Sequence, residues 1–214
     1  MSLVTATNVI ERPQYLKAAL RLELLTVAWM ILEAVGALVA ALLARSVLLL
    51  AFGIDSGIEL LSATVLFHRL KKEFNGDLDL EQTEKLERQT ARIAGWLLYL
   101  LAIYVTLQAA YSLWHRNTAE TSFLGMGIAV IAAISMPILA RAKLRIANII
   151  GSQALRADAM ETLTCGYLSW VLLAGLVANA FLHWWWLDSA ACFAIVPLLL
   201  REAKEAFTGK CYCD

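Results

Sequence analysis

The sequence predicts an all-α integral membrane protein, a bundle of six transmembrane helices with the N- and C-termini in the cytoplasm. Three observations predict this fold. The 214 residues are 60% apolar and 17% charged, with a mean hydropathy of +0.66, whereas soluble domains have about 45–50% apolar and about 25% charged residues. The apolar residues are gathered in six long runs, and the basic residues are concentrated in alternate connections between those runs.

A helix that crosses the hydrocarbon core, roughly 30 Å thick, needs about 20 mostly apolar residues. We expect six runs of about this length to form the spanning helices, and the sixth, which contains Pro197, is the shortest. In chain order the runs are 22–44, 47–67, 93–113, 122–140, 157–180 and 184–200. No cleavable signal is expected at the start, because 1–21 carries charges and lacks a short apolar core with a cleavage site.

The connections between the runs differ in length and charge. Only Arg45 and Ser46 separate the first two runs, and a tight turn near Leu182 is expected between the last two. The segment 69–92 is rich in Leu, Glu and Lys, and we expect it to extend the second and third helices into the cytosol. Residues 141–156 are expected to connect the fourth and fifth helices.

The distribution of Lys and Arg predicts the orientation, because cytoplasmic loops carry an excess of these residues. Only Arg45 and Arg116 fall on the outer side. The remaining basic residues among the 18 fall on the inner side: Arg12, Lys17, Arg21, Arg69, Lys71, Lys72, Lys85, Arg88, Arg92, Arg141, Lys143, Arg145, Arg156, Arg201, Lys204 and Lys210. Trp184, Trp185 and Trp186 then lie at the outer interface, where aromatic side chains gather.

We divide the chain into a cytoplasmic N-terminal segment (1–21), a six-helix transmembrane domain (22–207) and a short cytoplasmic tail (208–214). The tail is too short to form a core of its own. The expected location is the inner (plasma) membrane, with several passes through the lipid bilayer. The sparse cysteines do not resemble the disulfide framework of a secreted scaffold, so a cytosolic tail would keep Cys211 and Cys213 reduced.

Acidic residues inside the spans are the informative feature. Asp55 and Glu59 lie in the second run and Glu161 in the fifth. Each carboxylate costs roughly 2.5–3.5 kcal/mol at the centre of a spanning helix. We therefore expect these side chains to face the interior of the bundle, where they share protons, polar partners or a cation.

The spacing of these acids favours a metal site. Asp55 and Glu59 are four residues apart on one helix face, and Glu161 and Cys165 repeat that spacing. Two facing helices with such pairs provide four ligands, the number that zinc prefers. Gly53 and Gly57 have the Gly-x-x-x-Gly spacing that allows a second helix to come close. The alternative is that the acids are protonated and only hold the helices together.

Asp55-Ser-Gly-Ile-Glu59 resembles the second-helix signature of the cation diffusion facilitators, Asp-Ser-x-x-(Asp/His). Residues 152–165 are similar to the fifth-helix signature of that family, Ser-x-Ala-x-x-Ala-Asp-x-x-His-x-x-x-Asp, and Trp186-Leu-Asp188 resembles the entry to its sixth helix. The resemblance implies six helices and export of divalent metals from the cytosol, usually in exchange for protons. It also implies that the metal ligands are Asp55, Glu59, Glu161 and Cys165.

This sequence departs from the family pattern at two ligand positions. Glu161 stands in place of the usual His, and Cys165 stands in place of the usual second acid of the fifth helix. A thiolate disfavours Mg²⁺ and Mn²⁺ and suits Zn²⁺, Cd²⁺ or Co²⁺. The family's soluble C-terminal metal-binding domain is expected to be missing, which weakens the expectation of a homodimer.

Further polar residues have two interpretations each. Glu33 either lines the pathway and carries a proton or bonds across helices. Asp158 is a secondary metal candidate that we expect to cap or position the fifth helix, and Asp188 is expected to cap the sixth. Cys211 and Cys213 either capture soft metals or are disordered. Cys192 is expected in the core.

The sequence therefore predicts a proton-coupled exporter of a zinc-like metal. The metal and protons are substrates, and no resident cofactor or nucleic-acid partner is expected. Buried carboxyl groups favour their protonated forms, and metal ligands bind in deprotonated forms, so metal and protons should compete. The alternative is a metal-binding or regulatory membrane protein that does not transport. An enzyme is not expected, because the connections lack a His/Ser/Asp or Gly-rich constellation.

Overall fold

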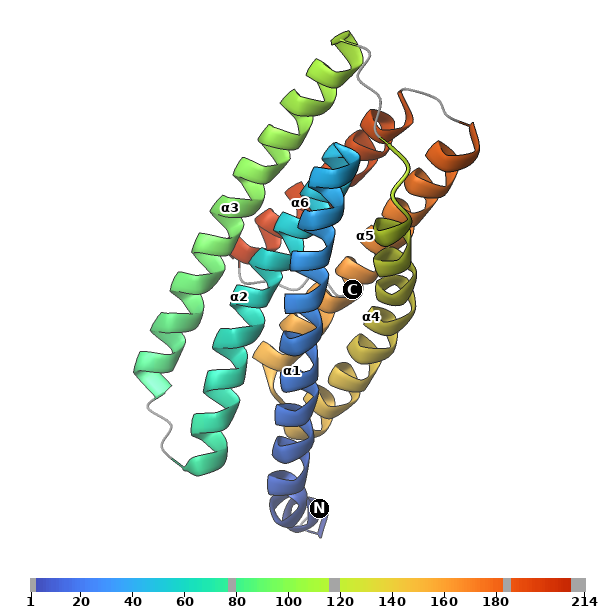
Figure 1. Cartoon of the computed structure of the whole chain (residues 1–214). Coiled ribbons are helices and arrows are strands. Elements are labelled where there is room, and N and C mark those ends of the chain that lie inside the picture. Colours follow the sequence, from blue (N-terminus) through green and yellow to red (C-terminus); the bar gives the residue numbers. More distant parts are fainter. Residues whose placement is uncertain (1–2, 77–79, 116–119, 183–185, 209–214) are drawn as a thin grey trace.

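The computed structural model describes residues 3–76, 80–115, 120–182 and 186–208. These residues form six α-helices and contain no strand, which confirms the predicted all-α class (Figure 1). The helices are α1 (Leu3–Ala44), α2 (Val47–Asn75), α3 (Leu80–His115), α4 (Phe123–Ile150), α5 (Gln153–Leu182) and α6 (Leu187–Thr208).

The helices form a membrane bundle, as predicted. Among the described residues, five apolar helical segments are long enough to cross a bilayer: Pro13–Ala44, Val47–Asn75, Gly95–His115, Phe123–Ile150 and Ala154–Phe181. The sixth helix, α6, carries ionisable residues near both ends and lies along α3. Large apolar side chains such as Leu32 and Leu42 are mostly exposed on the outside of the bundle, where lipid would cover them.

The helices pack most closely as three pairs, which are α1 with α2, α4 with α5, and α3 with α6. The second helix, α2, also contacts α3, α5 and α6. Its buried residues include Leu48, Ala51 and Phe52 on the side facing its neighbours. The most contacted helix is therefore the one that carries two of the predicted metal ligands.

The short and extended connections agree with the sequence analysis. Only Arg45 and Ser46 lie between α1 and α2, and Arg45 adopts a left-handed φ of 51°. Residues 69–75 extend α2 and residues 80–92 extend α3, as predicted. The second helix ends where Gly76, with a φ of 77°, donates its backbone N–H to the carbonyls of Glu73 and Lys72.

The structure corrects two expectations about helix boundaries. Most of 141–156 is helical, and only Gly151 and Ser152 separate α4 from α5. Gly151 has a φ of 70° and donates to the Ala147 carbonyl, so it ends α4 sharply. At the other end, α1 begins at Leu3 rather than near Leu22, so residues 3–21 are helical and continue into the first span.

Asp188 caps a different helix from the one we expected. Although it lies in the first turn of α6, its carboxylate accepts hydrogen bonds from Ser46 Oγ (2.5 Å) and from the backbone N–H groups of Val47 (3.1 Å) and Leu48 (3.4 Å). The two backbone N–H groups belong to the first turn of α2 and have no partner within the helix, and a carboxylate is favoured at this end of a helix. Asp188 therefore fixes α6 to α2, two turns above Asp55.

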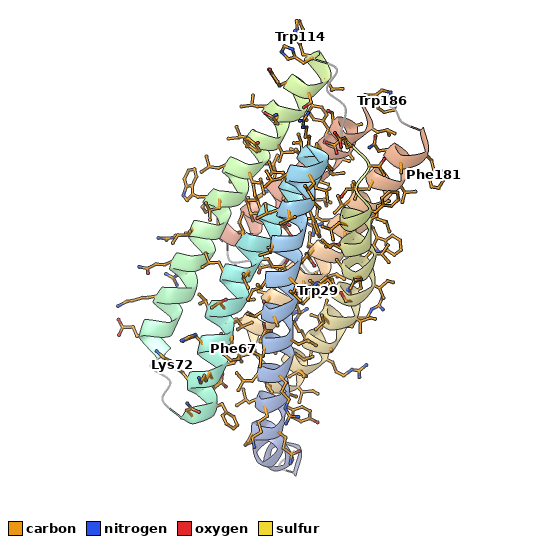
Figure 2. All side chains as sticks on the ribbon, in the orientation of Figure 1. Trp29, Phe67, Lys72, Trp114, Phe181 and Trp186 are labelled. Carbon is orange, nitrogen blue, oxygen red and sulfur yellow. The ribbon has the colours of Figure 1, made fainter. Side chains whose placement is uncertain are left out.

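The two ends of the bundle differ in their side chains. Figure 2 shows Trp114, Phe181 and Trp186 at one end and Lys72 at the other. This arrangement agrees with an aromatic outer interface and a basic inner one. Trp184 and Trp185 lie outside the described residues.

Candidate metal-binding site

The first predicted pair of ligands, Asp55 and Glu59, lies on the buried face of α2. Gly53, two residues before Asp55, allows α1 to approach, because a Cβ there would lie 3.1 Å from the Leu38 backbone nitrogen. Gly57 has open space around it. The predicted close approach of a second helix therefore occurs at Gly53 and does not extend to Gly57.

The second predicted pair lies on α5. Cys165 is buried, whereas Glu161 is half-buried. Gly166 brings α5 against α4, because a Cβ at this position would lie 3.0 Å from the ring of Pro137. The side chain of Ser152 accepts a hydrogen bond from the Leu155 backbone N–H (3.3 Å) and begins this helix.

Glu33 of α1 joins the two pairs. Its Oε1 accepts hydrogen bonds from Ser56 Oγ of α2 (2.8 Å) and from Cys165 Sγ of α5 (3.4 Å). Its Oε2 accepts a hydrogen bond from Trp29 Nε1 (2.6 Å). Glu33, which the sequence analysis treated as a secondary candidate, therefore lies at the junction of α1, α2 and α5.

The acids and the thiol converge on one region of the bundle. Asp55, Ser56 and Glu59 are buried on the face of α2, and Glu33 Oε1 joins this face to Cys165 of α5 through its two hydrogen bonds. Glu59 Oε1 is buried and accepts no hydrogen bond within the described residues. Such an oxygen is available to a proton or a cation.

The site is tightly packed in this conformation. A cavity of about 10 Å³, the size of a single water molecule, lies beside Asp55 and is otherwise lined by apolar side chains of α2, α5 and α6 such as Phe52, Leu172 and Ile195. In the part of the chain that the structure describes, no three His, Cys, Asp or Glu side chains are grouped closely enough to hold a metal ion. Loading a metal would therefore require the ligands to move closer together.

The sequence profile of the cation efflux transmembrane domain matches residues 24–207. The chain belongs to the cation efflux family. This result confirms the resemblance noted from the motifs in α2 and α5. The manganese efflux system protein MneS of Bacillus subtilis (strain 168) is 26% identical to the efflux bundle over 123 residues. The aligned segment covers 58% of this chain and 42% of MneS, so less than half of that relative is matched.

A second charged cluster in the efflux bundle joins α1, α4 and α5. The Lys143 ammonium lies 2.5 Å from Asp158 Oδ2, 3.1 Å from Glu23 Oε1 and 3.3 Å from Thr162 Oγ1. Lys143 and Glu23 are fully buried. Asp158 therefore pairs with Lys143 from the body of α5, and Ser152, rather than Asp158, caps that helix.

The sequence analysis did not identify this cluster, because Lys143 was assigned to the cytoplasmic side and Glu23, inside the first predicted run, was not considered as a site residue. The burial of Lys143 could have been recognised from the helical period of residues 140–147. Ala140, Lys143 and Ala147 share the buried face of α4, whereas Arg141 and Arg145 are exposed. This pattern was not considered because 141–156 was expected to be a connection between helices.

Of the three remaining cysteines, the structure describes only Cys192. Cys192 is buried in the core, as expected. Cys211 and Cys213, the predicted metal-capturing pair of the tail, lie outside the described residues.

Proposed function

We propose that this protein exports a divalent transition metal from the cytosol, with Asp55, Glu59, Glu161 and Cys165 as the ligands. Membership of the cation efflux family supports transport of a metal cation. The observation that carries the site is the pair of hydrogen bonds by which Glu33 joins Ser56, next to Asp55 on α2, to the buried Cys165 thiol of α5. Buried carboxyl groups are costly at this depth, and a transported cation offsets that cost.

The proposed substrates are Zn²⁺, Cd²⁺ and Co²⁺. A thiolate ligand favours these ions, whereas carboxylate and carbonyl oxygens favour Mn²⁺. The relative MneS is a manganese efflux protein, and this likeness favours Mn²⁺ as the second candidate. Three of the four proposed ligands are carboxylates, so the choice depends on whether Cys165 binds the ion.

The proposed driving force is an exchange of metal for protons. The Cys165 thiol and the buried carboxyl groups must lose their protons to bind a metal. When the site opens outward, external protons displace the metal and reset the carrier. Because the ligands are not grouped for metal binding in this conformation, we infer that α2 and α5 move relative to each other during the cycle.

The test is uptake of Zn²⁺, Cd²⁺, Co²⁺ and Mn²⁺ into vesicles that contain the purified full chain, with and without an imposed pH gradient. We expect the thiophilic ions to move faster than Mn²⁺, and the gradient to accelerate them. A transport rate that does not change with the pH gradient would contradict the exchange of metal for protons. Metal binding without flux supports the alternative of a non-transporting metal-binding protein.

A matched pair of variants tests the site. We expect Glu161→Gln to abolish metal transport without loss of the folded protein, because the amide keeps the shape of the side chain and removes its charge. Glu120→Gln makes the same change at an exposed residue between α3 and α4 and should transport normally. Equal transport by the two variants would exclude Glu161 as a ligand.

A further inference from the structure

The cluster around Lys143 has the chemistry of a cation site whose cation is part of the protein. The ammonium donates to Glu23 Oε2, Asp158 Oδ2 and Thr162 Oγ1, so its three donors are all used and every partner is an oxygen. We propose that Lys143 is a tethered cation that fills a site formed by Glu23, Asp158 and Thr162, and thereby prevents a second metal ion from binding in the bundle.

The oxygen atoms of this site outnumber the donors of the ammonium. Glu23 and Asp158 both lie within 3.1 Å of the same ammonium nitrogen. In the described part of the chain, Asp158 Oδ1 is buried and accepts no hydrogen bond, and Glu23 Oε1 has an ion-pair contact with the ammonium but no hydrogen bond. Two carboxyl groups that face each other and a hydroxyl are ligands typical of Mg²⁺, Ca²⁺ and Mn²⁺. A divalent ion would satisfy more of these oxygens than one ammonium does.

The Lys143 site is separate from the proposed transport site and closer to the cytosol. Lys143 follows Phe123, the first residue of α4, by 20 residues, and a helix of that length extends for about 30 Å. It therefore lies near the inner edge of the hydrocarbon core. Asp158 precedes Cys165 by seven residues of α5, which places the two about 10 Å apart along the helix axis.

This placement has a consequence for metal entry. An ion that approaches from the cytosol along α5 passes Asp158 before it reaches Glu161 and Cys165. Two ionised carboxylates at that point would hold a divalent ion, and the Lys143 ammonium removes that competing site. The conclusion that the bundle holds a single metal ion rests on the proposed transport site. The conclusion that Lys143 fills the inner site does not depend on it.

The experiment measures Mn²⁺ binding to the purified full chain in detergent, in a background that carries Asp55→Asn to disable the proposed transport site. We expect the Asp55→Asn variant to bind no Mn²⁺ at micromolar concentrations. Adding Lys143→Ala should create one Mn²⁺ site, detected by equilibrium dialysis and by the electron paramagnetic resonance spectrum of the bound ion. In the chain without the Asp55 change, Lys143→Ala should likewise add one Mn²⁺ site to those that the chain with Lys143 binds.

Two controls identify the ligands of the new site. Lys143→Arg in the Asp55→Asn background keeps a cation in place and should bind no Mn²⁺. Asp158→Asn, added to the Lys143→Ala chain, removes one carboxylate and should abolish the gained binding. A folded Asp55→Asn, Lys143→Ala chain that binds no more Mn²⁺ than its parent would overturn the inference.

The same variant remains informative if the loss of Lys143 disturbs folding. Two buried carboxylates without a cation are destabilising, so the variant should melt at a lower temperature in chelator and regain stability when Mn²⁺ is added. Equal melting with and without Mn²⁺ would count against the inference. Failure of the chain with Asp55 and Lys143 unchanged to bind any of Zn²⁺, Cd²⁺, Co²⁺ and Mn²⁺ would contradict the proposed function and leave this comparison decisive.

Discussion

Cys165 is the residue whose chemistry distinguishes this site from one made of carboxylates alone. It is buried at the junction of α1, α2 and α5, and its thiol donates to Glu33 Oε1 at 3.4 Å. A thiol held by an acid has a ready acceptor for the proton that it must lose before it binds a metal. The single sulfur is therefore the atom on which the choice of metal depends.

Replacing this sulfur should change the choice of metal. We predict that Cys165→Asp lowers the ratio of Cd²⁺ to Mn²⁺ transport by about tenfold, or about 1.4 kcal/mol of relative stabilisation, because four carboxylates favour the harder ion. The measurement is competitive uptake of the two ions into vesicles. Cys192→Ala is the matched control, since Cys192 is also buried but belongs to α6. An unchanged ratio for Cys165→Asp would mean that the thiol does not contact the ion.

At the scale of the helices, the position of α2 decides where Asp55 and Glu59 lie. Asp188 and Ser46 fix its first turn, and the contact at Gly53 sets its distance from α1. Both features lie within three turns of Val47, the first residue of the helix. Changes there should move or loosen the ligands without touching them.

The two glycines of α2 provide a matched comparison. We predict that Gly53→Ala lowers the melting temperature in detergent relative to Gly57→Ala, because its Cβ would lie 3.1 Å from the Leu38 backbone nitrogen, which cannot move aside as a side chain can. At Gly57 there is open space, so alanine should raise helix stability by about 1 kcal/mol. Equal melting temperatures would show that α1 and α2 are not closely packed at Gly53.

The carboxylate of Asp188 should also contribute measurably to stability. We predict that Asp188→Ala lowers the free energy of unfolding by about 1–3 kcal/mol, because three donors at the start of α2 lose a charged acceptor. The measurement is denaturant-induced unfolding in mixed micelles, followed by circular dichroism. Asp188→Asn keeps one acceptor oxygen and should lose less. An Asp188→Ala variant as stable as the parent would show that Ser46 alone caps α2.

The sequence was sufficient for features that depend on neighbouring residues. Run lengths predicted the six helices, and Arg45 and Ser46 were recognised as the whole link between α1 and α2. The partner of Asp188 could not be predicted in this way, because Ser46 lies 142 residues away and only packing brings them together. The burial of Lys143 could have been predicted from the helical period of 140–147, but its partners could not, since they belong to α1 and α5.

The predicted ligands show the same limit. The four-residue spacing on each helix placed Asp55 and Glu59 on a shared buried face. The distance between α2 and α5 depends on contacts such as Gly175 of α5 against Leu48 of α2, which no spacing rule specifies. Whether the four side chains close around an ion therefore stays a prediction.

At the scale of the whole molecule, one end of the bundle is tied together by polar contacts. The Glu120 backbone N–H donates to the Ala44 carbonyl at 2.8 Å, and Asp188 binds Ser46 beside it. At the opposite end, the 29 residues of α2 extend for about 43 Å, which exceeds the hydrocarbon core. Asn75 at the end of α2 is therefore expected in water on the side opposite to Glu120.

The basic residues predict which of these two ends faces the cytosol. We expect a cysteine at Glu120 to react with a membrane-impermeant maleimide added to intact cells, and a cysteine at Asn75 to react only after permeabilisation. Both positions are exposed, whereas Cys165 and Cys192 are buried. The substitutions are made in a chain with Cys211→Ser and Cys213→Ser so that the tail adds no signal.

The outcome distinguishes an exporter from a protein of the opposite orientation. Labelling of Glu120→Cys alone in intact cells would place the Lys143 cluster, and the entrance to α5 beside it, on the cytosolic side. Labelling of Asn75→Cys alone in intact cells would show that the bundle has the opposite orientation. The path past Asp158 would then begin outside the cell, and export through the proposed sequence of sites would be ruled out.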